Sequence, residues 1–228
     1  MPHVSIILAA AGLGVRMGRD VKKPYLLIKG KPILQHSLER FLDVNGVREI
    51  IVAVDPSELE SAKREWKDKY SGCGVGVKIV PGGRRRQDSV SEALKHLEPQ
   101  TEIVLVHDAV RPVVTGEMIE AVINRAQTSG AAILAVPVNA TIKEVEGRQK
   151  IVRTVDRQRL WMAQTPQGFR KDVLLRAYDA LIKEDVEVTD DAQAVERLGH
   201  PVEIVPGSHT NIKITTPDDL ALAEALIS

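Results

Sequence analysis

The chain has 228 residues, of which 43% are apolar, and it carries equal numbers of basic and acidic side chains, 31 of each. This composition suits one large domain with a hydrophobic core. The absence of a basic excess and the low aromatic content of 3% argue against a nucleic-acid-binding protein. No segment approaches the ~20 apolar residues of a membrane span, and the single cysteine, Cys73, cannot form an intramolecular disulfide, so we expect a cytoplasmic protein.

Short β-branched runs alternate with helical patterns over the first 136 residues. The predicted strands are Val4–Ala9, Glu49–Val54, Gly76–Val80, Glu102–His107 and Ala131–Val136. The predicted helices are Pro32–Leu42, Ser57–Tyr70, Ser89–Leu97 and Gly116–Gln127. This alternation predicts an α/β fold with a doubly wound, mostly parallel sheet covered by helices on both faces. We expect one domain spanning residues 1–228.

The pattern changes after Val138. Residues Thr141–Arg157 alternate as strands do, around a polar turn at Glu146-Gly147-Arg148. This segment is either a protruding β-hairpin arm at about residues 138–157 or an ordinary edge hairpin, and the spacing fits both.

The last third of the chain returns to alternating elements. We predict helices near Lys171–Lys183 and Asp190–Leu198, and strands near Val202–Val205 and Ile212–Ile214. Thr216 is a good N-cap for a final helix that begins at Pro217.

The first loop begins like a dinucleotide-binding fingerprint, with Gly12 and Gly14 two residues apart. The third glycine is missing, because Met17 stands in its place, and Asp55 lies much further on than the ~20 residues at which a ribose-binding acid is expected. The loop carries four cations instead: Arg16, Arg19, Lys22 and Lys23. So much positive charge favours a triphosphate or a departing pyrophosphate, and an NAD-binding dehydrogenase remains a distant alternative.

Two further loops follow strands at the same predicted edge of the sheet. Gly82 and Gly83 allow close backbone approach to a ligand, and the Arg84–Arg86 run after them is at least partly a solvated face. Asp108 follows a buried strand, where it is placed to hold Mg²⁺ together with substrate phosphates.

Three residues near this edge have structural interpretations as well. We favour a satisfied, half-buried histidine for His107 and a loop-fixing ion pair for Arg111. Lys213 lies between two isoleucines and points either outward or into the cleft, and alternation does not choose. Together these loops predict a Mg²⁺-dependent enzyme acting on a nucleoside triphosphate.

Seven motifs in order carry a family resemblance: AAAGLGVRMG, GGRRRQDSV, VHDAVRP, TVDRQRLW, AQTPQGF, VTDDAQAVE and NIKITTPDDL. Over nearly its whole length the chain resembles the 2-C-methyl-D-erythritol 4-phosphate cytidylyltransferases of the non-mevalonate isoprenoid pathway. The resemblance implies transfer of CMP from CTP to methylerythritol phosphate, giving 4-CDP-2-C-methyl-D-erythritol and pyrophosphate. A ribitol 5-phosphate (pentitol-phosphate) cytidylyltransferase is the alternative, because it shares the CTP half of these motifs.

The resemblance also implies roles for individual residues. The catalytic residues would be Arg16, Lys23 and Lys213, with Asp108 holding Mg²⁺. CTP would contact Ala10, Ala11, Gly12, Gly14, Gly82, Gly83, Ser89 and Ala109. The polyol phosphate would contact Arg157, Thr165, Thr189 and Lys213. The arm would form a homodimer in which Arg157 serves the partner's site.

The chain departs from the family pattern at two positions. Lys22-Lys23-Pro24-Tyr25 replaces the usual Pro-Lys-Gln before the aromatic residue, so Lys22 becomes a second candidate for the catalytic lysine if the loop shifts. Arg84 stands where the family often has an acid, which puts a ribose contact from that side chain in doubt.

Overall fold

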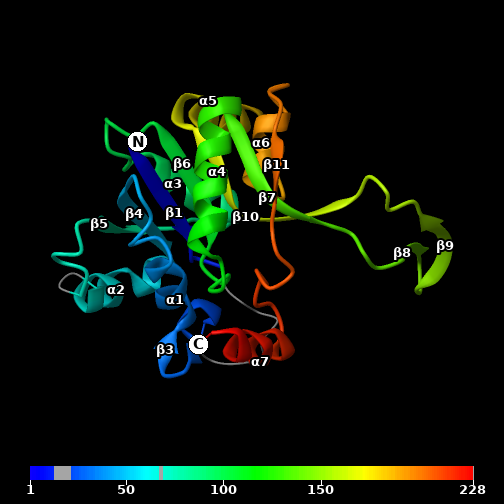
Figure 1. The fold of residues 1–228 in the computed structure, drawn as a ribbon, viewed down its shortest axis with the longest axis horizontal. Coiled ribbons are helices and arrows are strands. Elements are labelled where there is room, and N and C mark those ends of the chain that lie inside the picture. The colour runs from blue at the N-terminus through cyan, green and yellow to red at the C-terminus, as the bar shows by residue number, and fades with distance from the viewer. Residues whose placement is uncertain (13–21, 67–68, 228) are drawn as a thin grey trace.

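A seven-stranded mixed sheet forms the centre of the computed structural model, which describes residues 1–12, 22–66 and 69–227 (Figure 1). The strands are β1 (Val4–Ala9), β4 (Val47–Val54), β5 (Gly76–Pro81), β6 (Ile103–Asp108), β7 (Ala131–Pro137), β10 (Trp161–Arg170) and β11 (Glu203–Pro206). Their order in the sheet is β11-β7-β10-β6-β1-β4-β5. Strand β1 pairs in parallel with both β4 and β6, as the sequence predicts.

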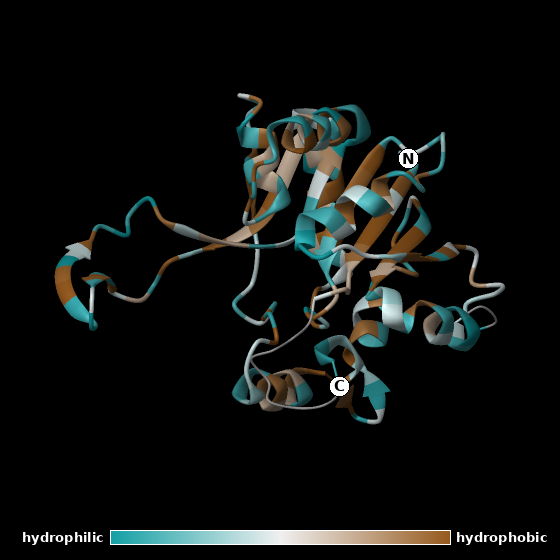
Figure 2. Ribbon diagram, turned by 180° about the vertical axis from the view of Figure 1, so that it is seen from behind, coloured by the Kyte–Doolittle hydropathy of each residue, from teal (hydrophilic) through white to brown (hydrophobic). Residues whose placement is uncertain are grey.

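Helices cover both faces of this sheet, because side chains alternate along each strand. On β1, Ile6 and Leu8 pack toward one face and Ile7 toward the other, and all three are fully buried. The first face carries α1 (Ile33–Glu39), α2 (Leu59–Trp66) and α4 (Gly116–Ser129), and the second carries α3 (Arg86–Leu94), α5 (Lys171–Glu184) and α6 (Asp191–Glu196). Apolar strands sandwiched by amphipathic helices are visible in Figure 2. The doubly wound fold is confirmed.

A smaller apolar cluster lies beside the carboxyl ends of the strands. It combines a short pair, β2 (Leu27–Ile28) and β3 (Lys31–Pro32), with α7 (Pro217–Leu226). The Thr216 hydroxyl accepts a hydrogen bond from the Asp219 N–H, so the predicted N-cap of α7 is confirmed. Two 3₁₀ turns are also present: Lys23–Tyr25 precedes β2, and Pro56–Glu58 follows β4.

Two expectations differ from the structure. The sequence predicts a strand at Ile212–Ile214, but these residues belong to no strand of the structure, and the Ile214 N–H donates to the Val110 carbonyl at 2.9 Å. Strand β10, antiparallel between β6 and β7, does not follow from the sequence pattern. Its TPQGF segment contains Pro166, which has no N–H to donate, and the register shifts between Ala163 and Gln167 to accommodate it.

The hairpin is an arm and not part of the sheet's edge. Strands β8 (Ile142–Glu146) and β9 (Lys150–Val155) pair with each other in a separate two-stranded sheet, which projects far from the body in Figure 1. The arm interpretation of residues 138–157 is therefore the right one. Along the described part of the chain, none of the helices combines the length and the apolar character needed to span a bilayer.

Candidate active site

A cleft of about 460 Å³ opens at the carboxyl edge of the sheet, beside the ends of β1 and β6. It brings together residues that the sequence predicted from five separate segments: Ala10, Ala11, Gly12, Lys23, Gly83, Ser89, Asp108 and Lys213. Ligands of open α/β sheets bind at this edge, where parallel strands end and the following loops diverge. Predicted site residues Gly14 and Arg16 lie outside the described residues.

Glycines let two of these loops touch. A Cβ atom added at Gly82 would lie 2.4 Å from the Ala11 Cβ, and one at Gly83 would lie 2.3 Å from the Asp88 Cβ. The Ser89 hydroxyl accepts a hydrogen bond from the Gly83 N–H at 3.0 Å. The Gly82 contact brings the loop after β5 against Ala11 in the loop after β1, and the Gly83 contacts hold that loop against the start of α3.

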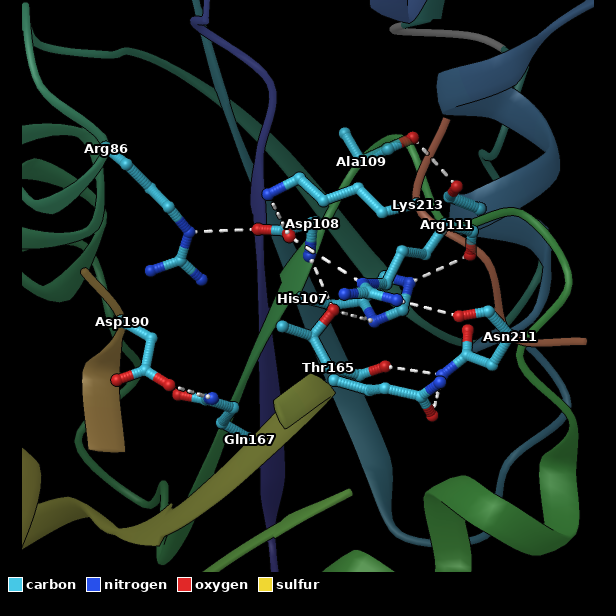
Figure 3. Close-up of polar contacts among 12 residues, drawn as sticks. Arg86, His107, Asp108, Ala109, Arg111, Thr165, Gln167, Asp190, Asn211 and Lys213 are labelled. Carbon is cyan, nitrogen blue, oxygen red and sulfur yellow. Dashed lines mark hydrogen bonds and ion pairs between the residues drawn. The ribbon is translucent and has the colours of Figure 1, made fainter. Parts of the chain in front are cut away.

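Asp108 is the focus of charge in the cleft. Its Oδ1 lies 2.9 Å from Arg86 Nε, its Oδ2 lies 2.7 Å from Lys213 Nζ, and Arg111 Nε is 3.7 Å away (Figure 3). Burial alone would raise the pKa of Asp108, but the cations Arg86, Lys213 and Arg111 hold it well below its usual range. The carboxylate is therefore ionised at any working pH.

The lysine positions are also resolved. Lys213 points into the cleft, which answers the choice that alternation left open. Lys23 lines the cleft too, whereas Lys22 Nζ lies 3.2 Å from Asp55 Oδ1 and 3.1 Å from Glu58 Oε1. This arrangement favours Lys23 as the lysine that meets a ligand. Asp55, the carboxylate that a dehydrogenase would need to bind ribose, is thus already paired with Lys22.

Beneath Asp108 lies a chain of buried hydrogen bonds. The Asp108 N–H donates to Thr165 Oγ1 at 3.0 Å, and Thr165 Oγ1 lies 3.0 Å from His107 Nδ1. His107 Nε2 faces the Arg111 carbonyl oxygen at 3.1 Å, and a carbonyl only accepts, so Nε2 carries the proton. His107 is thus neutral and satisfied as expected, but fully buried. The predicted ion pair of Arg111 is formed with Asp108 at 3.7 Å, and Arg111 Nη1 also donates to the Asn211 carbonyl at 2.7 Å.

The neutral His107 makes stability depend on pH. Burial lowers the pKa of His107 from 6.5 to about 4. In the unfolded chain His107 becomes protonated near pH 6.5, whereas in the folded chain it stays neutral until about pH 4. The neutral histidine therefore contributes its full stability above pH 6.5, and this contribution is lost as the pH falls toward 4. We expect the wild type to lose ~3 kcal/mol more unfolding free energy than His107→Gln between pH 7 and 4. Urea unfolding at a series of pH values checks this, and parallel curves for the two proteins would contradict it.

A second layer behind Asp108 does not follow from the sequence pattern. Arg86 Nη2 lies 2.8 Å from Asp191 Oδ2, so this arginine joins β6 to the start of α6. Gln167 on β10 donates to Asp190 Oδ2 at 2.8 Å and accepts from the Ala192 N–H at 2.9 Å. The only signal for Arg86 in the sequence is its place in a run of three arginines before a predicted helix. This signal does not identify which of the three arginines turns inward.

Other predicted residues lie apart from the cleft. Ala109 is fully buried, and its carbonyl accepts from the Ser37 hydroxyl at 2.8 Å. Thr189 is exposed and bonds through its backbone N–H and hydroxyl to Gln193 Oε1. Arg157 lies at the base of the arm and donates to the Asn139 carbonyl. Within one chain, these three side chains are not among the described residues that line the cleft.

The donor set at Asp108 fits a magnesium ion that arrives with its substrate. Among the residues described, no group of three or more His, Cys, Asp or Glu side chains could hold a metal by itself. Mg²⁺ commonly takes one or two carboxylates and completes its shell with phosphate oxygens and water. Asp108, at the edge of a cation-lined cleft, offers one such carboxylate.

Comparisons with known proteins agree on one family. A family model described as 2-C-methyl-D-erythritol 4-phosphate cytidylyltransferase matches residues 4–228. The enzyme of that name from Syntrophus aciditrophicus is 47% identical over 226 residues, covering 99% of this chain and 96% of the relative. The structure of 4-diphosphocytidyl-2C-methyl-D-erythritol synthase from Anaerococcus prevotii aligns with a TM-score of 0.85 and 31% identity, covering 98% of this chain and 95% of that one. The cytidylyltransferase from Thermus thermophilus aligns with a TM-score of 0.80 and 35% identity, covering 97% and 96%.

Proposed function

This chain belongs to the 2-C-methyl-D-erythritol 4-phosphate cytidylyltransferase family, and we propose that it carries out the family's reaction in the cleft around Asp108. The protein is a nucleotidyltransferase that transfers CMP from CTP to 2-C-methyl-D-erythritol 4-phosphate, giving 4-CDP-2-C-methyl-D-erythritol and pyrophosphate. The approach of Lys213 to Asp108, in a cleft that Lys23 also lines, carries the proposal. The names of the relatives favour this acceptor over ribitol 5-phosphate.

The reaction needs positioned cations more than a protein nucleophile. An oxygen of the acceptor phosphate attacks the α-phosphorus of CTP in line, and the bond to the departing pyrophosphate breaks. Lys23 and Lys213 stabilise the negative charge that develops on the phosphoryl oxygens, with Arg16 in the same role. Lys213 leaves Asp108 for the phosphates when CTP binds. The backbone of Ala10, Ala11, Gly12, Gly82 and Gly83, with Ser89, surrounds the cytidine.

Magnesium is the proposed cofactor. Bound to Asp108 and to phosphate oxygens of CTP, it would neutralise triphosphate charge and favour the departure of pyrophosphate. Asp108 is held in a fixed position for this task, because its side chain is buried and its backbone N–H donates a hydrogen bond to the Thr165 hydroxyl. Because the single cysteine is unpaired, as is usual in a reducing compartment, we also propose a cytoplasmic location.

We propose that the arm makes the protein a homodimer. An isolated two-stranded hairpin is marginally stable in water, and this one exposes Val145, Ile151 and Val152 by 52–57%. Trp161 and Met162 at its base are exposed by 43% and 46%. Burying these apolar side chains against a second copy would stabilise both arms. Arg157 would then reach the acceptor phosphate in the partner's cleft. Contacts from Thr165 and Thr189 stay predictions, because Thr165 is buried beneath Asp108 and Thr189 lies outside the described lining of the cleft.

A mixed-dimer experiment tests this sharing. Arg157→Ala and Lys23→Ala each remove a residue that we assign to one composite site, so each homodimer should be nearly inactive. In a mixed dimer, one of the two sites receives both an intact Lys23 and an intact Arg157. Mixing the two variants after dissociation should therefore restore up to about one quarter of wild-type turnover, since half of the dimers are mixed. No recovery, with mixed dimers demonstrated by differently tagged chains, would contradict the sharing.

The function itself is tested by pyrophosphate release from purified protein with CTP and Mg²⁺. We expect release with 2-C-methyl-D-erythritol 4-phosphate and little with ribitol 5-phosphate at equal concentration. Release with ribitol 5-phosphate alone would keep the CTP site and overturn the acceptor. A parallel reaction without acceptor measures background hydrolysis of CTP.

A further inference from the structure

The strongest unexplained feature near the site is the arginine that lies between two carboxylates. Arg86, at the first position of α3, contacts Asp108 Oδ1 through Nε at 2.9 Å and Asp191 Oδ2 through Nη2 at 2.8 Å. Asp191 is fully buried, and its Oδ1 accepts a hydrogen bond from the Tyr178 hydroxyl at 2.6 Å. The reaction as described above uses neither Arg86 nor Asp191.

The charges in this buried group cancel. Arg86 and Arg111 are balanced by Asp108 and Asp191, and Lys213 approaches from the more exposed side, with 41% of its side chain accessible. Without the charge on Asp191, the two cations Arg86 and Arg111 would face the single carboxylate of Asp108. That carboxylate would then offer little net attraction to a further cation, because buried charges act on each other through a medium of low polarity.

The two oxygens of Asp108 also have different surroundings. Oδ1 is occupied by Arg86, whose position is set from behind by Asp191. Oδ2 meets Lys213, which approaches from the cleft side (Figure 3). Lys213 is the partner that can leave, because its side chain is exposed and flexible, whereas the guanidinium of Arg86 is held by a carboxylate on each side.

We propose that Arg86, anchored by Asp191, is a positioning residue for Asp108: it occupies Oδ1 and leaves Oδ2 available to a cation in the cleft. Asp191 is the essential anchor, because it balances the charge of Arg86 and prevents this arginine from taking both oxygens of Asp108. The contact between Arg86 and Asp191 is an ion pair without hydrogen-bond geometry, so Asp191 acts on Arg86 through its charge. The inference rests on the proposed metal-binding role of Asp108.

Loss of the anchor should therefore turn Arg86 into a competitor of the metal. In Asp191→Asn, Arg86 has one carboxylate left to balance it, so it should pair with Asp108 alone. Removing Arg86 as well, in the double variant Arg86→Gln/Asp191→Asn, should remove the competitor. A residue with a merely structural role would give the opposite order, because two substitutions in the packed layer disturb it more than one.

Calorimetric titration of CTP provides a readout that is independent of turnover. For each protein, the dissociation constant of CTP is measured with Mg²⁺ and again with EDTA. The value in EDTA divided by the value in Mg²⁺ is the enhancement of CTP affinity by the metal. We expect Asp191→Asn to reduce this enhancement by about tenfold, and the double variant to recover most of it. An unchanged enhancement in Asp191→Asn, or a double variant poorer than the single one, would overturn the proposal.

Two further variants separate charge from packing. Asp191→Glu keeps the charge and should keep the enhancement within about threefold, and a tenfold loss there would overturn the proposal even if Asp191→Asn failed to fold. Arg197→Gln is the matched control. Its guanidinium lies 2.6 Å from Glu184 and joins α6 to α5 away from the cleft, so its enhancement should equal the wild type's.

Asp108→Asn distinguishes this inference from the proposed function. If Asp108 binds the metal, the enhancement is abolished in this variant. Retention of the enhancement there would reject the metal-binding role itself. Loss of the enhancement in Asp108→Asn together with full retention in Asp191→Asn would reject only the positioning role of Arg86 and Asp191.

Discussion

Lys23→Ala should lower turnover by roughly 10²–10³-fold while leaving the fold intact. Lys23 lines the cleft that contains Asp108 and Lys213, so its ammonium group is placed to meet phosphate oxygens. Stabilisation of charge that develops in the transition state typically has an effect of this size. The measurement is pyrophosphate release at saturating CTP and acceptor, with the melting temperature determined on the same preparation.

Lys22→Ala is the matched control, since it removes the same side chain one position earlier. Lys22 is held by Asp55, Glu58 and the Ser57 hydroxyl, and such ion pairs at the surface contribute at most ~1 kcal/mol. Its turnover should stay within about twofold of the wild type. The reverse result, an active Lys23→Ala and an inactive Lys22→Ala, would transfer the catalytic role to Lys22.

Asp108→Asn should have two effects at once. Turnover should fall by roughly 10²–10³-fold, because the proposed metal loses its one protein carboxylate. The free energy of unfolding should also fall by about 3 kcal/mol, because Arg86 and Arg111 lose a buried counter-charge. Denaturant unfolding and pyrophosphate release on one preparation measure both quantities.

Glu203→Gln provides the control for Asp108→Asn. Glu203 lies 2.9 Å from Arg125, with about half of each side chain exposed, so its loss should cost less than ~1 kcal/mol and leave turnover unchanged. Should Asp108→Asn unfold at the same denaturant concentration as Glu203→Gln, the carboxylate would not be the buried counter-charge that the geometry indicates.

Local pattern was enough to predict the parallel strands and the loops that end at one edge of the sheet. Strands β1, β4 and β6 are mostly apolar runs, and the loops after β1, β5 and β6 place Gly12, Gly82 and Asp108 at the carboxyl edge of the sheet. The signal is strong because a strand buried on both faces has few polar positions to interrupt it. Thr216 and Pro217 likewise mark the start of α7 by local chemistry.

Other features depend on contacts between distant segments, which local pattern does not contain. Strand β10 includes Pro166 and Gly168 and is stabilised by its central position between β6 and β7. Lys213 lies in neither a strand nor a helix. Its position is set by two hydrogen bonds of neighbouring residues: the Ile214 N–H donates to the Val110 carbonyl, and the Asn211 side-chain amide donates to the Thr165 carbonyl at 3.0 Å. Arg86 turns inward because it pairs with Asp191, which lies far along the chain from it.

The arm has a further consequence for how this protein can change. Its two ends leave β7 and β10 where these strands already pair, with Pro137 opposite Trp161. The whole segment between them is thus an insertion into the loop of a hairpin, and closing a longer or shorter loop there changes the free energy only slowly with length. The length of the arm can therefore change while the sheet keeps its register. Because Arg157 lies in this segment, the arm couples the proposed subunit assembly to the proposed binding of the acceptor, and a tight turn joining residues 137 and 161 would remove both at once.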